Sequence, residues 1–226
     1  MTEAPAEGRR LLVPLYAHPA THPEAWAQLQ AAAPLLYGVV LNAADGPGHR
    51  PDPAFTEAAG RLRRAGVRLL GYTDTGYGRR RPRAVAADIR RHRRWYDVDG
   101  VFLDQVPSGA AVLPHYRRLV LIARTLGART VALNPGTHPD PGYARLADLL
   151  VTFEGSWAEY RRAGVPPWTA DHPPGRFCHL VYAVPDDGAE HVARTAERRG
   201  AGVHCAVPGD GANPWQSAPL TTGAVR

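Results

Sequence analysis

The chain has 226 residues, of which 44% are hydrophobic, enough for one α/β domain with a full core. All 27 basic residues are arginines, and the formal net charge is +6. The densest basic stretch, residues 79–94, has neither interleaved aromatic residues nor a nucleic-acid motif, so we expect a solvated helix face and no nucleic-acid partner. No apolar run is long enough to span a membrane, so we expect no membrane partner either.

Eight short apolar segments are typical of buried strands, and most of them are separated by one helix. The predicted strands span residues 11–16, 38–42, 68–73, 101–103, 130–134, 149–154, 177–184 and 201–207. The predicted helices span residues 22–33, 53–65, 82–94, 110–126, 143–147, 157–163 and 187–199. This alternation predicts a single α/β domain, a (β/α)8 TIM barrel over residues 11–220, with a disordered lead-in at 1–10 and a tail at 221–226. A doubly wound open sheet is the alternative.

Polar side chains stand where the predicted strands end, and in a barrel those ends converge on one mouth. Two of them are carboxylates, Asp104 and Glu154, and each directly follows apolar residues. Glycoside hydrolysis requires at least two carboxyl groups that face one cavity. Phe153 and Trp157 flank Glu154, and apolar neighbours raise the pKa of a carboxyl group, as a general acid needs. The alternative is that each acid pairs with one of the many arginines.

The other polar and aromatic residues near the predicted strand ends are candidates for binding a sugar. Aromatic rings suit the apolar faces of sugar rings, although any of them could instead pack in the core. The predicted substrate-binding residues are Tyr16, His18, Asn42, Tyr72, Asp74, Tyr77, Gln105, Asn134, Trp157, His179, Tyr182 and Trp215.

We expect no metal and no cofactor. His18, His179 and His204 lack a compact ligand spacing, and no Gly-rich phosphate loop follows the first predicted strand. Cys178 and Cys205 each lie inside an apolar segment, which indicates buried thiols and a reducing compartment. With no signal peptide before the first strand, the expected location is cytoplasmic, or extracellular if a leader has been removed.

Four motifs occur in register along the chain: residues 71–78 (GYTDTGYG), 95–104 (WYDVDGVFLD), 134–137 (NPGT) and 153–154 (FE). Together they resemble the spherulin-4 proteins, or spherulation-specific family 4, over residues 12–219. The resemblance implies a (β/α)8 barrel related to glycoside hydrolases. Such enzymes cut α-1,4-linked polysaccharides that contain N-acetylgalactosamine, such as galactosaminogalactan. It also implies that Asp104 and Glu154 are the catalytic acids and that the partner is a polysaccharide or oligosaccharide.

The chain departs from the family pattern directly after Asp104. Family members commonly have an Asp-Glu pair there, whereas this chain has Gln105, an amide that cannot ionise or carry a proton. Thr73 and residues 204–207 also differ from the pattern. The leading hypothesis is an endo-acting glycoside hydrolase with Asp104 as nucleophile or charge stabiliser and Glu154 as general acid/base. The resemblance and the compact barrel favour retention, and inversion through a water molecule between more widely spaced carboxyl groups is the alternative. The alternatives are a non-catalytic carbohydrate-binding barrel and an anion-binding protein that uses the Arg-rich helix.

Overall fold

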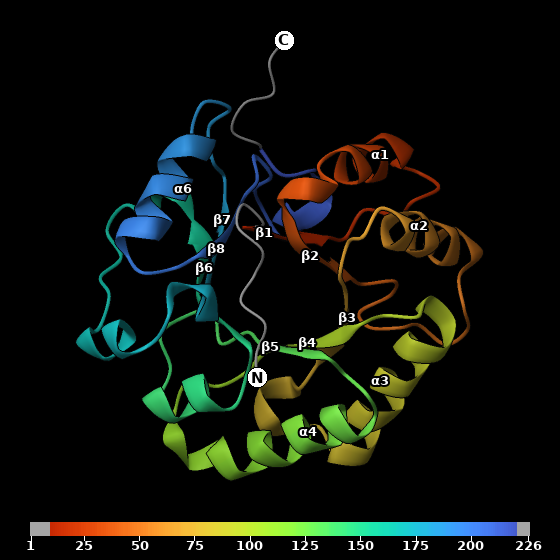
Figure 1. Ribbon diagram of the computed structural model, residues 1–226, viewed down its shortest axis with the longest axis horizontal. Coiled ribbons are helices and arrows are strands. Elements are labelled where there is room, and N and C mark those ends of the chain that lie inside the picture. Colours follow the sequence, from red (N-terminus) through yellow and green to blue (C-terminus); the bar gives the residue numbers. More distant parts are fainter. Residues whose placement is uncertain (1–9, 221–226) are drawn as a thin grey trace.

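The eight apolar segments form the eight parallel strands of one closed barrel in the computed structural model, which describes residues 10–220 (Figure 1). Each strand pairs with the next, and β8 returns to β1 through Leu11 and His204. The strands are β1 Leu11–Leu15, β2 Leu36–Leu41, β3 Leu69–Asp74, β4 Gly100–Asp104, β5 Thr130–Leu133, β6 Leu149–Ser156, β7 Phe177–Tyr182 and β8 Val203–Ala206. The predicted (β/α)8 barrel is confirmed, and the open sheet is wrong.

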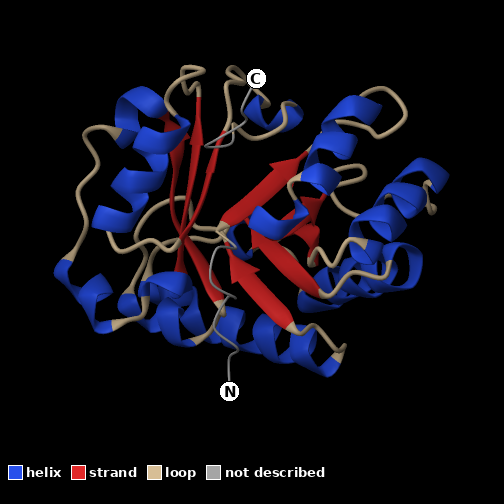
Figure 2. Ribbon diagram, turned by 45° about the horizontal axis from the view of Figure 1, so that its top comes forward, coloured by secondary structure: helices blue, strands red, loops and turns tan. Residues whose placement is uncertain are grey.

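Helices enclose the strands, as Figure 2 shows, but they do so unevenly. Helices α1 to α4 curve around one half of the barrel, and α6 lies on the opposite side (Figure 1). The α-helices are α1 Pro23–Ala31, α2 Pro53–Arg64, α3 Pro82–Tyr96, α4 Leu113–Thr125, α5 Trp157–Tyr160 and α6 Ala189–Arg198. No helix within residues 10–220 is long and apolar enough to cross a membrane.

The helices on either side of β6 are shorter and less regular than the sequence pattern predicts. The expected helix at 143–147 is a 3-10 helix, Pro141–Arg145, and the expected helix at 157–163 is the single turn α5. Prolines flank the two segments, three within residues 135–141 and four within 166–174, which leaves little chain for a longer helix on those sides. Ser156 does cap α5, forming a capping box with Glu159.

The bounds of β6 and β8 also differ from the prediction. Strand β6 runs two residues beyond its expected end, whereas β8 is shorter than expected. The segment after β8 is mostly loop, with a short 3-10 helix, Pro214–Gln216, that buries Trp215. Of the predicted lead-in at 1–10 and tail at 221–226, residues 1–9 and 221–226 lie outside the described residues. Arg10, the last residue of the predicted lead-in, donates its backbone N–H to the carbonyl of Leu35.

A tight turn connects α3 to β4 and sets where β4 begins. Asp97 ends α3 in the left-handed conformation, with φ of 51°. The carboxylate of Asp99 accepts a hydrogen bond from the backbone N–H of Leu69 at 3.0 Å, which ties the turn to β3. Gly100 then starts β4 so close to β5 that a Cβ there would lie 2.2 Å from the carbonyl oxygen of Thr130.

We therefore expect Gly100→Ala to force β4 and β5 apart and to lower the free energy of unfolding by about 1–3 kcal/mol. The measurement is urea denaturation followed by circular dichroism. Gly164→Ala is the matched control, because a Cβ at Gly164 meets no heavy atom within 4 Å. Equal urea midpoints for the two variants would show that the close approach of the strands is unimportant.

Candidate active site

Strands β4, β5 and β6 are neighbours, and they bring three polar side chains to one mouth of the barrel. Asp104 is the last residue of β4, Asn134 directly follows β5, and Glu154 lies in β6. Backbone hydrogen bonds fix their relative heights: Asn134 N–H donates to Leu103, and Glu154 N–H donates to Gly136. These bonds hold the three residues on neighbouring strands at the same mouth of the barrel.

The amide nitrogen of Asn134 donates to both carboxylates. It lies 2.7 Å from Oδ1 of Asp104 and 2.6 Å from Oε2 of Glu154, so these two oxygens are at most 5.3 Å apart. The orientation of the amide is not arbitrary, because its oxygen accepts a hydrogen bond from Gly136 N–H at 3.0 Å. A flipped amide would lose all three hydrogen bonds.

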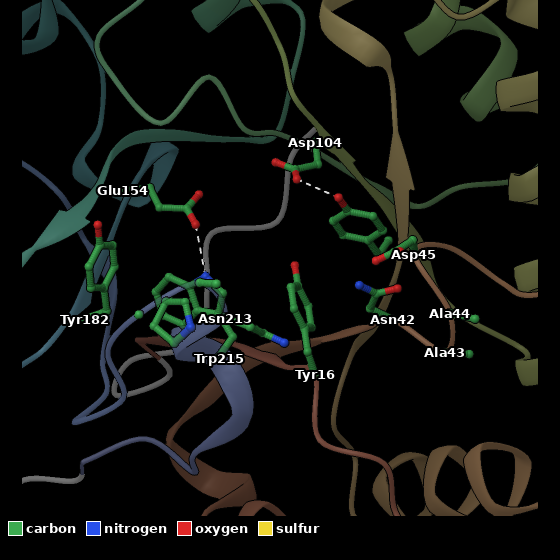
Figure 3. Close-up of a pocket in the computed structure, with 14 residues that line it drawn as sticks. Tyr16, Asn42, Ala43, Ala44, Asp45, Asp104, Glu154, Tyr182, Asn213 and Trp215 are labelled. Carbon is green, nitrogen blue, oxygen red and sulfur yellow. Dashed lines mark hydrogen bonds between the residues drawn. The ribbon is translucent and has the colours of Figure 1, made fainter.

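Each of the other two carboxylate oxygens also has a donor (Figure 3). The hydroxyl of Tyr72 donates to Oδ2 of Asp104 at 2.8 Å, and the indole N–H of Trp215 donates to Oε1 of Glu154 at 3.1 Å. Within residues 10–220, no arginine forms an ion pair with either acid, so pairing with arginine does not explain them.

The protonation of the two acids follows from their surroundings. Burial raises the pKa of Glu154 to about 6, and the charge of Asp104 adds to this effect, although the hydrogen bonds from Asn134 and Trp215 oppose it. Burial also raises the pKa of Asp104, while the donors Tyr72 and Asn134 lower it. Glu154 can therefore hold and release a proton at mildly acidic pH while a neighbouring carboxylate is charged.

Both acids open into a cavity of about 590 Å³ at the carboxyl ends of the strands. In Figure 3, Glu154, Tyr182 and Trp215 lie on one side, and Asn42 and Asp45 lie on the other. The lining residues are Tyr16, Asn42, Ala43, Ala44, Asp45, Tyr72, Asp104, Glu154, Tyr182, Gly211, Ala212, Asn213, Pro214 and Trp215. The polar groups of the cavity are carboxylates, amides, hydroxyls and the indole N–H of Trp215, and none of these lining residues is cationic.

Seven of the fourteen residues predicted for the site line this cavity, and an eighth, Asn134, connects the two acids. The seven are Tyr16, Asn42, Tyr72, Asp104, Glu154, Tyr182 and Trp215. Two edge-to-face aromatic pairs occur among them: Tyr16 with Tyr72 at 5.6 Å and Tyr182 with Trp215 at 6.2 Å between ring centroids. Choosing the residues at or near the predicted strand ends therefore identified both acids and the aromatic residues that line the cavity with them.

The other six predicted residues do not line the cavity, and local partners explain several of them. The ring of His18 pairs with Asp52 at 3.1 Å, beside the start of α2. Trp157 packs edge-on against His191, with 5.0 Å between ring centroids. His179 is buried, its Nδ1 lies 2.9 Å from the hydroxyl of Tyr160, and burial lowers its pKa to about 3.

The remaining three lie at or just beyond the ends of β3 and β4: Asp74 is the last residue of β3, Tyr77 lies in the turn that follows, and Gln105 directly follows β4. Asp74 accepts a hydrogen bond from Gly76 N–H at 2.5 Å, and Tyr77 is exposed. Gln105 has a left-handed backbone, with φ of 53°, and its carbonyl oxygen accepts from Tyr77 N–H and from Thr75 Oγ1. The difference between Gln105 and the usual glutamate thus lies outside the wall of the cavity.

Asp45 and Asn213 line the cavity but were missed from the sequence. Asp45 lies in the loop 43–48 directly after β2, so a search of the residues that follow each predicted strand would include it. Asn213 lies in the segment after β8, where no periodic pattern marks a position. Among residues 10–220, no three His, Cys, Asp or Glu side chains are grouped to hold a metal ion.

The family model described as spherulation-specific family 4 matches residues 10–219. The chain belongs to this family. Over 159 residues it is 34% identical to spherulin-4 of Physarum polycephalum; the aligned part covers 68% of this chain and 47% of that protein. The chain therefore spans about half the length of that relative, and the predicted resemblance is confirmed.

Solved structures that are similar to this chain include the following two. The crystal structure of Aspergillus clavatus Sph3 in complex with GalNAc has a TM-score of 0.81 and 25% identity, covering 96% of this chain and 95% of that one. A chitinase from Rhizomucor miehei has a TM-score of 0.58 and 10% identity, covering 92% and 98%. The likeness to the chitinase shows the barrel fold alone.

We expect the carboxyl group of Glu154 to titrate near pH 6 and Asp104→Asn to lower this pKa, because the variant removes the neighbouring negative charge that raises it. The measurement is a pH titration of side-chain carboxyl 13C resonances, with the Glu154 signal assigned by its loss in Glu154→Gln. Asp171→Asn, at an exposed position, serves as the control. A Glu154 pKa that is the same in Asp104→Asn and in the parent protein would contradict the coupling.

Proposed function

We propose that this protein is an endo-acting glycoside hydrolase that cleaves an amino-sugar polysaccharide with retention at the anomeric carbon. The proposed substrate is an α-1,4-linked polymer that contains N-acetylgalactosamine, like galactosaminogalactan. One observation carries the proposal: a single amide holds one oxygen of each carboxylate, and these two oxygens are at most 5.3 Å apart at the mouth of a barrel. Carboxyl groups about 5–5.5 Å apart are typical of retaining enzymes, whereas inverting enzymes need about 6.5–9.5 Å.

In the first step, the carboxylate of Asp104 attacks the anomeric carbon, and the glycosidic C–O bond breaks. Glu154 gives its proton to the leaving oxygen, so one part of the polymer departs with a new hydroxyl group. The other part stays attached to Asp104 as a glycosyl ester. A pKa of Glu154 of about 6 suits this role, because a substantial fraction of the group is protonated at mildly acidic pH.

In the second step, Glu154 acts as a base. It takes a proton from a water molecule, whose oxygen attacks the anomeric carbon and displaces the carboxylate of Asp104. The product leaves with its original anomeric configuration, because two displacements invert the centre twice. Both acids return to their starting protonation states.

The neighbours of the acids have distinct supporting roles. Tyr72 donates to Asp104 and stabilises its charged form before attack. Asn134 and Trp215 donate to the two oxygens of Glu154 and stabilise the negative charge that appears when the proton leaves. Because Asn134 contacts both acids, it also fixes their separation.

The wall of the cavity favours an uncharged amino sugar over an acidic one. The side chains of Asn42 and Asn213 supply amide groups for hydroxyl and acetamido groups, and Tyr182 and Trp215 supply rings for an apolar sugar face. Three carboxylates and no arginine line the cavity, so a uronic acid or a sulfated sugar would be repelled. The GalNAc complex of the similar Aspergillus clavatus protein supports the same class of ligand.

Gln105 is the reason to consider a non-catalytic carbohydrate-binding barrel. Its side chain is not part of the cavity wall, whereas Asp104, Glu154 and Asn134 are all present with their hydrogen bonds. The amide in place of a glutamate therefore removes no ionisable group from the cavity. This observation favours the enzyme over the binding module.

We expect Asp104→Asn and Glu154→Gln each to lower kcat at least about a hundredfold, since each variant removes the nucleophile or the acid/base. Gln105→Glu is the matched control and should change activity less than about tenfold, or about 1.4 kcal/mol in barrier. The assay follows new reducing ends released from purified galactosaminogalactan, with circular dichroism as a check of folding.

Near-parental activity of either Asp104→Asn or Glu154→Gln would remove that residue from the mechanism. If the parent protein released no reducing ends from any amino-sugar polymer and Gln105→Glu did, the carbohydrate-binding module would be the better assignment.

A further inference from the structure

The turn between β3 and α3 contains an exposed tyrosine in an unfavourable backbone conformation. Gly76, Tyr77 and Gly78 are consecutive residues with φ of 56°, 54° and 81°. Glycine adopts this left-handed region freely, but a bulky side chain is strained there. Tyr77 therefore carries a cost that a third glycine would not.

The turn is nevertheless held firmly, and the groups that hold it belong to the segment that carries Asp104. Tyr77 N–H donates to the carbonyl of Gln105 at 2.9 Å. The hydroxyl of Thr75 shares its one proton between the carbonyls of Asp104 and Gln105, which lie 2.7 and 2.9 Å from Oγ1. Because Asp74 is in register with Asp104, the turn lies on the rim of the mouth, beside the proposed nucleophile.

Packing does not account for the aromatic ring of Tyr77. The residue is 55% exposed, and it is not one of the residues that line the cavity. Its ring contact is with Arg79, whose guanidinium carbon lies 5.8 Å from the ring centroid. A largely exposed side chain on a strained backbone stabilises the fold little, and strain of this kind clusters at ligand-binding positions.

We propose that Tyr77 forms an outer subsite, where its ring stacks on the apolar face of a pyranose unit of the polysaccharide bound in the cavity. This inference rests on the proposed function and extends it to sugar units beyond the cleavage point. The neutral ring offers contact area without charge, and the adjacent Arg79 offers donors to sugar hydroxyl groups. A rigid turn is suited to this role, because little freedom is lost when a sugar binds.

The experiment uses Tyr77→Gly, which removes both the ring and the backbone strain. We expect the variant to unfold at a higher urea concentration than the parent protein while it cleaves long substrates less well. The ratio of kcat/KM for purified galactosaminogalactan to that for its shortest cleavable oligosaccharide should fall at least about fivefold, the scale of one lost ring contact. Tyr77→Phe, which keeps the ring, should restore the ratio.

Asp97→Gly is the control for strain relief. Asp97 is also left-handed, with φ of 51°, but it lies before β4, at the opposite end of that strand from Asp104. This variant should leave the ratio unchanged. Retention of each protein in a gel that contains galactosaminogalactan measures binding without cleavage, and Tyr77→Gly should be retained less than the parent.

The outcomes separate the two claims. If the parent cleaves or binds the polymer and Tyr77→Gly has the parental length ratio and retention, the outer subsite is wrong and the proposed function stands. An equal loss on long and short substrates would make the turn a support for Asp104 and would also overturn the subsite. If the parent neither cleaves nor binds the polymer, the proposed function fails, and the outer subsite fails with it.

Discussion

The site depends on one amide group that two carboxylates share. Asn134 donates to Asp104 and Glu154 at once, and its own orientation is set by Gly136 N–H. Without this donor, two buried carboxylates at short range would repel each other and favour a different spacing. The barrel brings the three residues together on neighbouring strands, because Asn134 N–H donates to Leu103 of β4 and Glu154 N–H of β6 donates to Gly136 after β5.

The barrel and the acids could be predicted from the sequence because both depend on local pattern. Continuous apolar runs marked the strands, and Asp104 and Glu154 follow such runs directly. Asn134 was found by the same rule. The aromatic Trp215 was named as a candidate, but its hydrogen bond to Glu154 could not be foreseen, because the segment after β8 has no periodicity.

The side chains that were predicted for the site but lie elsewhere show what a pattern cannot determine. In a strand, alternate residues face opposite sides, so a shift of one residue decides whether a side chain enters the barrel. A register shift between Val151 and Phe153 in β6 breaks that alternation next to β7, where His179 turns to Tyr160. For His18, the deciding partner, Asp52, lies 34 residues away in the sequence.

The most direct test of the central claim is whether Asp104 forms a covalent bond to the sugar. A fluorinated glycosyl fluoride of N-acetylgalactosamine slows the second step, and mass spectrometry of the digested protein then locates any adduct. We expect the protein to gain one glycosyl unit on the peptide that contains Asp104 and Asp104→Asn to gain none. Cleavage of the natural polymer without such an adduct, or an adduct on another residue, would contradict retention through Asp104.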